Sequence, residues 1–242
     1  MRMLAAALSL TALAACATGG DVTLAFAEDP PSRVRGNVVT LDLEAGGIEI
    51  VPADGDTSGE TGHFHVFVDR EPVDEGEVIP REAGVVHSAE NPVVLYGLSP
   101  GEHTLTVVLG DGAHRRLRED VELGATVEVE GPSVDGSAPA TIEEGDDVAI
   151  GLKAEGVEIV AADGERSEET GHFHVLVDPS DPPEAGGLIP APEPNRIVHT
   201  VTDEVTISGL DRGEHTIWVV LGDGQHYAFD PPVMDRLTVT VE

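Results

Sequence analysis

The segment Gly62-His63-Phe64-His65-Val66 recurs as Gly171-His172-Phe173-His174-Val175, at an offset of 109 residues. A second shared segment follows in each half, because Gly101-Glu102-His103-Thr104 recurs as Gly213-Glu214-His215-Thr216 at an offset of 112 residues. The loop between the two segments is therefore three residues longer in the second copy. Each copy is about the size of one domain. The sequence therefore predicts a tandem duplication.

Both copies alternate apolar and polar residues at period two, in segments rich in Val, Ile and Thr such as 104–109, 216–221 and 237–241. This period indicates strands with one buried face. Turn sequences such as Gly110-Asp111-Gly112 separate the segments at the spacing of an antiparallel sandwich. We predict an all-β protein of two tandem immunoglobulin-like antiparallel β-sandwich domains. A small barrel is the alternative, because periodicity does not separate the two.

The domain boundaries follow from the repeat and from one short stretch of linker composition. Residues 131–135 contain Gly, Pro and Ser without periodic apolar residues, which favours a linker. The predicted order is a lipoprotein signal peptide at 1–15, a lipidated tether at 16–20, a first β-sandwich repeat at 21–130, the linker at 131–135 and a second repeat at 136–242.

The N-terminal sequence is typical of an export signal. Arg2 precedes the apolar run Leu4 to Ala15, which is too short to span a bilayer, and Leu13-Ala14-Ala15-Cys16 resembles a bacterial lipobox. In that interpretation Cys16 is lipidated and anchors the protein to a membrane of the cell envelope. Ala17 favours the outer membrane, with the protein facing the periplasm or the exterior. The alternative is an ordinary secretory signal, and because Cys16 is the only cysteine, no disulfide is expected.

The composition excludes one large class of partners. The chain has 46 acidic and 13 basic residues among 242, a formal net charge of −33. Phosphate backbones repel such a chain and no Lys/Arg cluster could grip them, so no nucleic-acid partner is expected. The charge favours cations instead. Apolar residues make up 40% of the sequence and aromatic residues 3%, which predicts folded domains with aliphatic cores.

Histidine is the residue type that points to chemistry. All ten histidines fall at equivalent places, five in each copy, while other positions have changed, such as Tyr96 to Ser208 and Thr106 to Trp218. The candidate metal ligands are His63, His65, His87, His103 and His114 in the first copy, and His172, His174, His199, His215 and His226 in the second.

Strand geometry explains why these positions suit a metal. Side chains two residues apart on a strand project from the same face about 7 Å apart, so His63 and His65 project together while Phe64 faces the other way. Imidazole nitrogens bind Zn(II) and Cu(II), and the nitrogen-rich set argues against Cu(I), which prefers sulfur. Affinity should fall as the pH drops below about 6.5, because protons compete for imidazole.

Other interpretations of the histidines remain open. His103 lies two and four residues before Leu105 and Val107 on the same predicted strand, so its side chain would point to the same face as theirs. It could therefore be a buried residue bonded to a backbone carbonyl. The histidines could instead form a network that only holds loops together, or a site for a non-metal ligand. The acidic turn 54–60 resembles a calcium loop. The equivalent turn of the second copy lacks the glycine found at Gly59 and contains Arg166, so we interpret both as solvated acidic turns. No hydrolase motif is present.

The combined motifs resemble a known family. Gly-His-x-His-Val-x-Val-Asp, Ile-Pro at 79–80 and 189–190, Leu-x-x-Gly-x-His-Thr at 98–104 and 210–216, and Gly-Asp-Gly-x-His are similar to the bacterial domain of unknown function 4399, here in two copies. The resemblance implies an exported, all-β, sandwich-like domain without an assigned role. Members often carry a third histidine where this chain has Phe64 and Phe173, and they are commonly single domains.

A looser resemblance would imply an enzyme. Copper-zinc superoxide dismutases also place a His-x-His strand on a β-sandwich, but this chain has no disulfide pair, and we expect no arginine guarding a substrate channel. The leading hypothesis is a lipid-anchored envelope protein whose repeats each bind Cu(II) or Zn(II) for storage, delivery or protection, without catalysis. Its protein partner as metal donor or acceptor is unknown. A scaffold or adhesion module with structural histidines, or a dismutase-like copper enzyme, are the alternatives.

Overall fold

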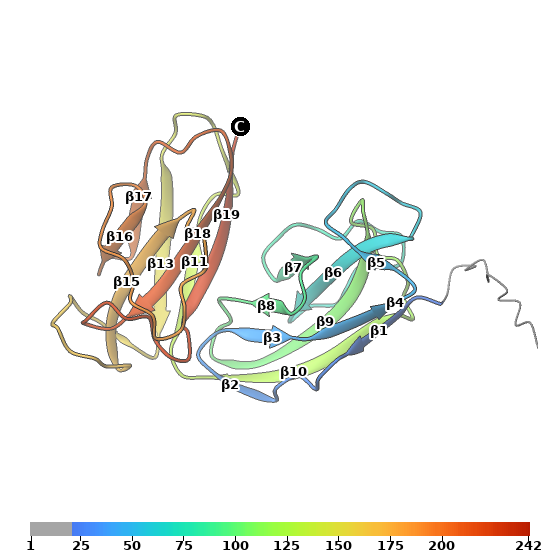
Figure 1. Cartoon of the computed structure of the whole chain (residues 1–242), viewed down its shortest axis with the longest axis horizontal. Helices are drawn as coiled ribbons and strands as arrows, with labels where there is room; N and C mark the ends of the chain where they lie inside the picture. The colour runs from blue at the N-terminus through green and yellow to red at the C-terminus, as the bar shows by residue number, and fades with distance from the viewer. Residues whose placement is uncertain (1–20) are drawn as a thin grey trace, which may run out of the picture.

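The computed structural model describes residues 21–242, and every regular element in that range is a β-strand (Figure 1). The prediction of an all-β chain with two tandem domains is confirmed. The immunoglobulin-like assignment stays a prediction. The proposed signal peptide, the tether and Cys16 lie outside the described residues. None of the described residues belongs to a helix long and apolar enough to cross a membrane.

The first repeat has one large sheet and one small layer opposite it. The large sheet has the order β2 (Arg33–Arg35), β10 (Glu122–Glu130), β9 (Gly101–Asp111), β6 (Thr61–Val68) and β5 (Glu49–Ile50), and β7 (Val85–Ser88) also pairs with β6. The small layer consists of the pairs β1 (Thr23–Phe26) with β4 (Leu43–Gly46), and β3 (Val39–Leu41) with β8 (Val93–Leu95). The same arrangement recurs in the second repeat.

There the large sheet has the order β12 (Thr141–Ile142), β19 (Met234–Val241), β18 (Gly213–Gly222), β15 (Thr170–Val177) and β14 (Glu158–Ile159), with β16 (Ile197–Thr200) on β15. The small sheet is β11 (Ser133–Ser137), β13 (Val148–Glu155) and β17 (Glu204–Ile207). The long strand β13 occupies the place of both β3 and β4, so the small layer is continuous in this repeat.

A mainly aliphatic core fills the space between the two layers of each repeat. In the first, Leu105, Val107 and Leu109 of β9 point inward with Phe64 and Val66 of β6. Burying a side chain of this size stabilises the fold by about 1.5–3 kcal/mol. Because Phe64 and Val66 face this core, strand alternation turns His63 and His65 to the opposite, outer face of the large sheet. The fold thereby sets the face on which the histidines lie.

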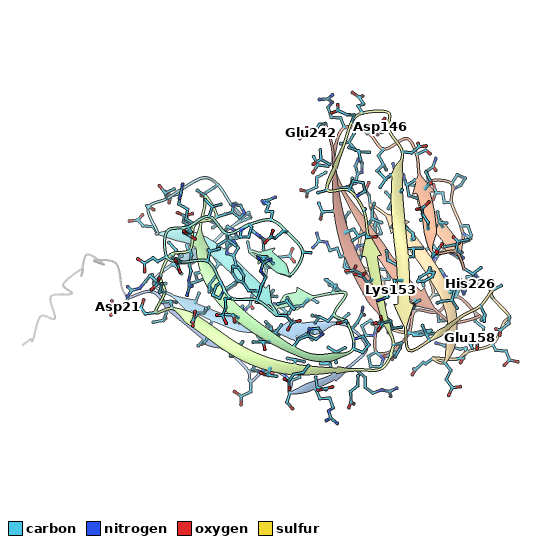
Figure 2. The ribbon with its side chains drawn as sticks, turned by 180° about the vertical axis from the view of Figure 1, so that it is seen from behind. Asp21, Asp146, Lys153, Glu158, His226 and Glu242 are labelled. Carbon is cyan, nitrogen blue, oxygen red and sulfur yellow. The ribbon has the colours of Figure 1, made fainter. Side chains whose placement is uncertain are left out.

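The two repeats meet through buried contacts at the joint. The side chain of Asn37, fully buried, donates a hydrogen bond to the Val134 carbonyl (2.9 Å) and accepts one from the Met234 amide (2.8 Å). Tyr96 and Trp218 pack edge to face, with ring centroids 4.8 Å apart. Strand β10 ends at Glu130 and β11 begins at Ser133, so residues 133–135 of the predicted linker lie in the second repeat's small sheet. Asp21 and Glu242 lie at the ends of the repeats away from this joint (Figure 2).

Candidate metal centres

Three of the first repeat's histidines come together through strand pairing. His63 and His65 lie on the outer face of β6, with ring centroids 4.4 Å apart. His87 of β7 is directly opposite His65 in the antiparallel register, and their centroids are 4.5 Å apart. Directly opposed residues on one face of a sheet have neighbouring side chains. The register of β6 and β7 therefore adds a third imidazole to the His-Phe-His pair.

The fourth histidine enters from the turn after β9. His114 has a left-handed backbone, with φ of 59°, and its ring lies 4.7 Å from that of His63. Asp111 shapes the turn, since its carboxylate accepts hydrogen bonds from the amides of Ala113 (2.9 Å) and Arg115 (2.8 Å). A non-glycine residue held at positive φ costs about 1–2 kcal/mol. The turn holds this conformation and directs the ring of His114 toward the sheet.

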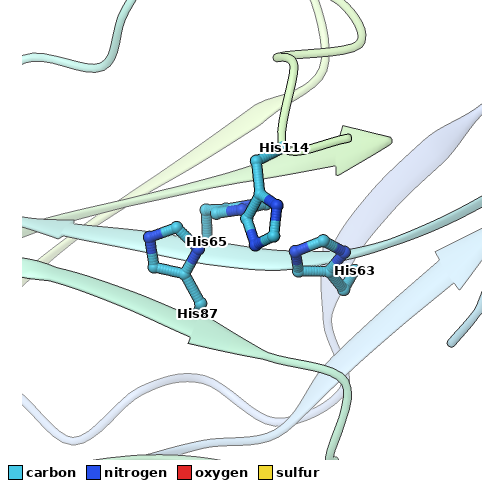
Figure 3. Close-up of side chains that lie close together, drawn as sticks. All are labelled: His63, His65, His87 and His114. Carbon is cyan, nitrogen blue, oxygen red and sulfur yellow. The ribbon is translucent and has the colours of Figure 1, made fainter. Parts of the chain in front are cut away.

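We define the first histidine cluster as His63, His65, His87 and His114 (Figure 3). One nitrogen from each ring lies within 4.8 Å of one nitrogen of every other ring, so the group could hold a metal ion. Nitrogens that share an ion at about 2.0–2.1 Å lie about 3–4 Å apart, so the cluster needs only small side-chain movements to coordinate one. The four rings come from β6, β7 and the turn after β9.

The hydrogen bonds within the described residues leave the lone pairs of three of the four rings free, those of His63, His65 and His87. Both ring nitrogens of His63 and of His65, and Nδ1 of His87, are buried without a hydrogen-bond partner. His65 is fully buried and His63 is 3% exposed. A buried polar atom without a partner costs about 1–3 kcal/mol, so sequences retain few of them without a reason. A bound metal ion would satisfy one nitrogen on each ring.

A hydrogen bond to a backbone carbonyl, present in both repeats, sets the tautomer of the third histidine. His87 Nε2 lies 3.0 Å from the carbonyl of Pro80, which can only accept, so Nε2 carries the hydrogen and Nδ1 carries the lone pair. The amide of Ile79 donates to the His114 carbonyl (2.7 Å), which ties the same segment to the turn. A ligating histidine commonly donates its other nitrogen to such an acceptor. The Ile-Pro motif therefore orients two members of the cluster.

Electrostatics keep the cluster neutral at pH 7. Burial, reinforced by the neighbouring histidines, lowers the pKa of His63 to about 4 and that of His65 to about 2. Burial also lowers the pKa values of His87 and His114. A neutral imidazole keeps the lone pair that metal coordination requires.

The second histidine cluster, His172, His174, His199 and His226, repeats this arrangement. Ring centroids are 4.3 Å apart for His172 and His174 and 4.4 Å apart for His174 and His199. His226 also has a left-handed backbone, with φ of 66°, and His199 Nε2 donates to the Pro190 carbonyl at 2.9 Å. Burial lowers the pKa of His172 to about 4 and that of His174 to about 2. All four nitrogens of these two rings are buried without a partner.

The fifth candidate ligand of each repeat, His103 or His215, does not join its cluster, and the structure agrees instead with the alternative of a buried histidine bonded to a backbone carbonyl. His103 Nδ1 bonds to Asp69 Oδ2 (2.6 Å) and its Nε2 to the Ser99 carbonyl (2.7 Å). His215 makes the same contacts with Asp178 (2.7 Å) and the Asp211 carbonyl (2.7 Å). Their strand parity turns them toward the core side of β9 and β18. Both ring nitrogens of His103 and of His215 are hydrogen-bonded, so these two residues are not metal ligands in the observed arrangement. The carboxylates of Asp69 and Asp178 bind these two histidines.

Sequence reasoning missed one charged neighbour of the first cluster. Arg81 Nη2 lies 3.2 Å from His114 Nε2, and the sequence predicted no role for Arg81. The repeat comparison could not reveal it, because the equivalent position in the second repeat is Ala191. The proline carbonyls were also missed, and the recurring Ile-Pro pair was the signal that could have indicated them.

Comparisons with known proteins agree with a duplicated domain. The family described as "Domain of unknown function (DUF4399)" matches residues 41–130 and 148–242. No curated protein matches the sequence significantly. Among solved structures, alpha-2-macroglobulin from E. coli is 13% identical with a TM-score of 0.31, and the match covers 93% of this chain and 17% of that one. A putative membrane anchored protein from Corynebacterium diphtheriae is 17% identical with a TM-score of 0.26, covering 91% and 53% of the two chains. The chain thus spans a minor part of the first structure and about half of the second.

Proposed function

The chain belongs to the DUF4399 family, in two tandem copies, and we propose that each copy binds one divalent transition metal ion through its four clustered histidines. The observation that carries the proposal is the set of buried imidazole nitrogens without partners, which recurs in both repeats. In a structural role these nitrogens would be paired with protein groups, as those of His103 and His215 are paired with a carboxylate and a backbone carbonyl. The contrast within one chain favours metal coordination for the clusters.

The donor set favours Cu(II) or Zn(II). All four donors of each cluster are imidazole nitrogens, a ligand type that suits Zn and Cu. Calcium and magnesium prefer oxygen ligands, and no carboxylate belongs to either group of four described residues. A bound ion would supply a localised positive charge and, for copper, one-electron chemistry. The residues of this chain would hold the ion, keep their rings neutral and exclude water from His63 and His65.

We place this activity in the bacterial cell envelope, with the protein anchored to a membrane by a lipid on Cys16. The support is the lipobox-like sequence Leu13-Ala14-Ala15-Cys16 after an apolar run. Storage, delivery or protection against excess metal would suit a protein of net charge −33, which concentrates cations near its surface. Cys16→Ser should move the protein from the membrane fraction to the soluble fraction of cells, and unchanged fractionation would contradict the anchor.

Calorimetric titration with Cu(II) and Zn(II) tests the metal proposal. We expect two equivalents for the protein, one for His63→Ala/His65→Ala, one for His172→Ala/His174→Ala, and none for the quadruple variant. Calcium provides the background for exposed carboxylates. If the quadruple variant still bound two equivalents, or the protein bound no more Zn(II) than Ca(II), the scaffold alternative would be favoured. Superoxide consumption by the copper-loaded protein, compared with the quadruple variant, would decide the enzymatic alternative.

A further inference from the structure

One charged side chain contacts a ring of the first cluster and has no counterpart in the second. In the first repeat the guanidinium of Arg81 reaches His114, with Nη2 3.2 Å from Nε2. In the second repeat the sequence Ile-Pro-Arg becomes Ile-Pro-Ala, so Ala191 stands at that position and no side chain from it can reach His226. The remaining geometry of the two clusters is closely similar. Arg81 is therefore a positive charge in hydrogen-bonding contact with the first cluster, and it has no counterpart at the equivalent position of the second.

The charge of Arg81 acts on the cluster rather than on a carboxylate. The pKa of His63 is lowered most by burial, next by the neighbouring histidines and then by the charge of Arg81. The charge of Arg81 also lowers the pKa values of His87 and His114, for which burial is the largest cause. Within the described residues no carboxylate lies at ion-pair distance from Arg81, and its neighbour Glu82 pairs with Arg70 at 2.6 Å. In the second repeat, by contrast, Arg166 pairs with the turn residue Asp223 at 2.9 Å.

The contact with His114 also has a consequence for coordination. A guanidinium has donors only, so His114 Nε2 must accept, and its lone pair is occupied by Arg81. A metal ion that uses this lone pair requires Arg81 to turn away. Arg81 is exposed and has a long side chain, so it can do so while staying near the cluster. A divalent cation and a guanidinium then lie close together and repel each other.

We propose that the first cluster binds its metal together with a small anion, which bridges the metal and the guanidinium of Arg81, whereas the second cluster binds metal without such an anion. An anion between the two cations removes their repulsion and receives charge-assisted hydrogen bonds from a planar group suited to carboxylates and oxyanions. Four imidazoles leave room for it, because Zn(II) expands to five ligands and Cu(II) accepts weak axial ones. The inference rests on the proposed metal sites and assigns a ligand class to one of them.

Azide binding to the copper-loaded protein tests this inference, read out by charge-transfer absorption and electron paramagnetic resonance. His172→Ala/His174→Ala leaves only the first cluster to bind copper, and His63→Ala/His65→Ala leaves only the second. We expect azide to bind the first cluster about tenfold more tightly than the second, the effect of one charge-assisted hydrogen bond. Arg81→Ala should remove the difference in the first background, and Ala191→Arg should raise azide affinity in the second.

The outcomes separate the two proposals. Copper bound at both clusters with equal azide affinities, or azide affinity unchanged by Arg81→Ala, would overturn the anion site and leave the metal sites intact. An increase in copper affinity in Arg81→Ala without a change in azide affinity would show that Arg81 only blocks the site, which also overturns it. Absence of copper binding at both clusters would overturn the proposed function together with this inference. Arg81→Lys should retain part of the azide affinity, because the charge remains and the planar fork is lost.

Discussion

The imidazole ring of His65 lies directly against the backbone of Gly110, on the neighbouring strand β9, so that a Cβ atom at residue 110 would overlap His65 Cε1. His174 and Gly222 have the same relationship in the second repeat. The absence of a side chain at these two positions makes the space in which the most buried histidine of each cluster fits. Gly110 and Gly222 are therefore part of the candidate metal centres, although neither can bind a metal.

Gly110→Ala should abolish metal binding by the first cluster and leave the second intact. The added methyl group must displace the His65 ring, which other rings surround, so the four nitrogens no longer converge. Calorimetry should report one equivalent of Zn(II) instead of two, and Gly222→Ala should give the same result. Gly124→Ala is the matched control, because a Cβ there meets no atom within 4 Å, and it should retain two equivalents. Two equivalents in Gly110→Ala would contradict this account.

The His103–Asp69 pair should affect stability but not metal stoichiometry. Asp69→Asn weakens a hydrogen bond to a ring that is only 6% exposed, which should lower the free energy of unfolding by about 1–3 kcal/mol. Urea denaturation measures that loss, and calorimetry should still give two equivalents. Asp178→Asn should behave alike in the second repeat, where the same aspartate also pairs with Arg196. Loss of one equivalent of bound metal in Asp69→Asn would indicate that His103 is a metal ligand after all.

The metal-free protein should lose stability as the pH falls below 6.5. Burial lowers the pKa of His65 and of His174 to about 2 in the folded state, so below 6.5 the unfolded chain binds protons that the folded chain does not. Each of these two groups should lower the free energy of unfolding by about 1.4 kcal/mol per pH unit in this range. His215 acts in the opposite direction. Burial opposes its charged form, but bonds to Asp211 and Asp178 outweigh this and raise its pKa.

The same pKa values change the expected pH dependence of metal binding. From an ordinary imidazole pKa, affinity should decline below about pH 6.5. In the folded protein the protons compete only at lower pH, because burial lowers the pKa values of His63, His65 and His87. Zn(II) affinity measured at pH 7 and pH 6 should therefore differ little, and should decline as the pH falls further. A tenfold loss of affinity between pH 7 and pH 6 would indicate exposed ligands instead.

Metal removal should lower the thermal stability of both repeats. An ion that binds only the folded state stabilises it by about 2.7 kcal/mol when its free concentration is 100 times the dissociation constant. Calorimetric scans with Zn(II) should therefore show a midpoint several degrees higher than scans with a chelator. His63→Ala/His65→Ala should retain only the second repeat's share of the shift. A midpoint insensitive to metal in the parent protein would contradict binding to the folded state.

The sequence predicted much of the fold because the relevant signals are local. Period-two alternation places Phe64 and Val66 on one face of β6 and His63 and His65 on the other, whatever surrounds the strand. Self-comparison reveals the duplication without any structure, and the family match over both segments agrees with it. The sequence did not reveal that β13 is one strand where β3 and β4 are two, because the propensities of single residues do not settle pairing across a sheet.

What only the tertiary structure decided is which of the five histidines of each repeat meet. His87 joins His65 because β7 pairs with β6 in that register, and His114 joins because Asp111 holds a left-handed turn. His103 is also a histidine that recurs in both repeats, but it lies on the core side of β9 and binds Asp69. Strand alternation is a property of a few consecutive residues, whereas convergence depends on contacts between segments far apart in the chain. For that reason the sequence by itself determined the His-Phe-His face, and the fold determined the four-histidine cluster and the arginine beside it.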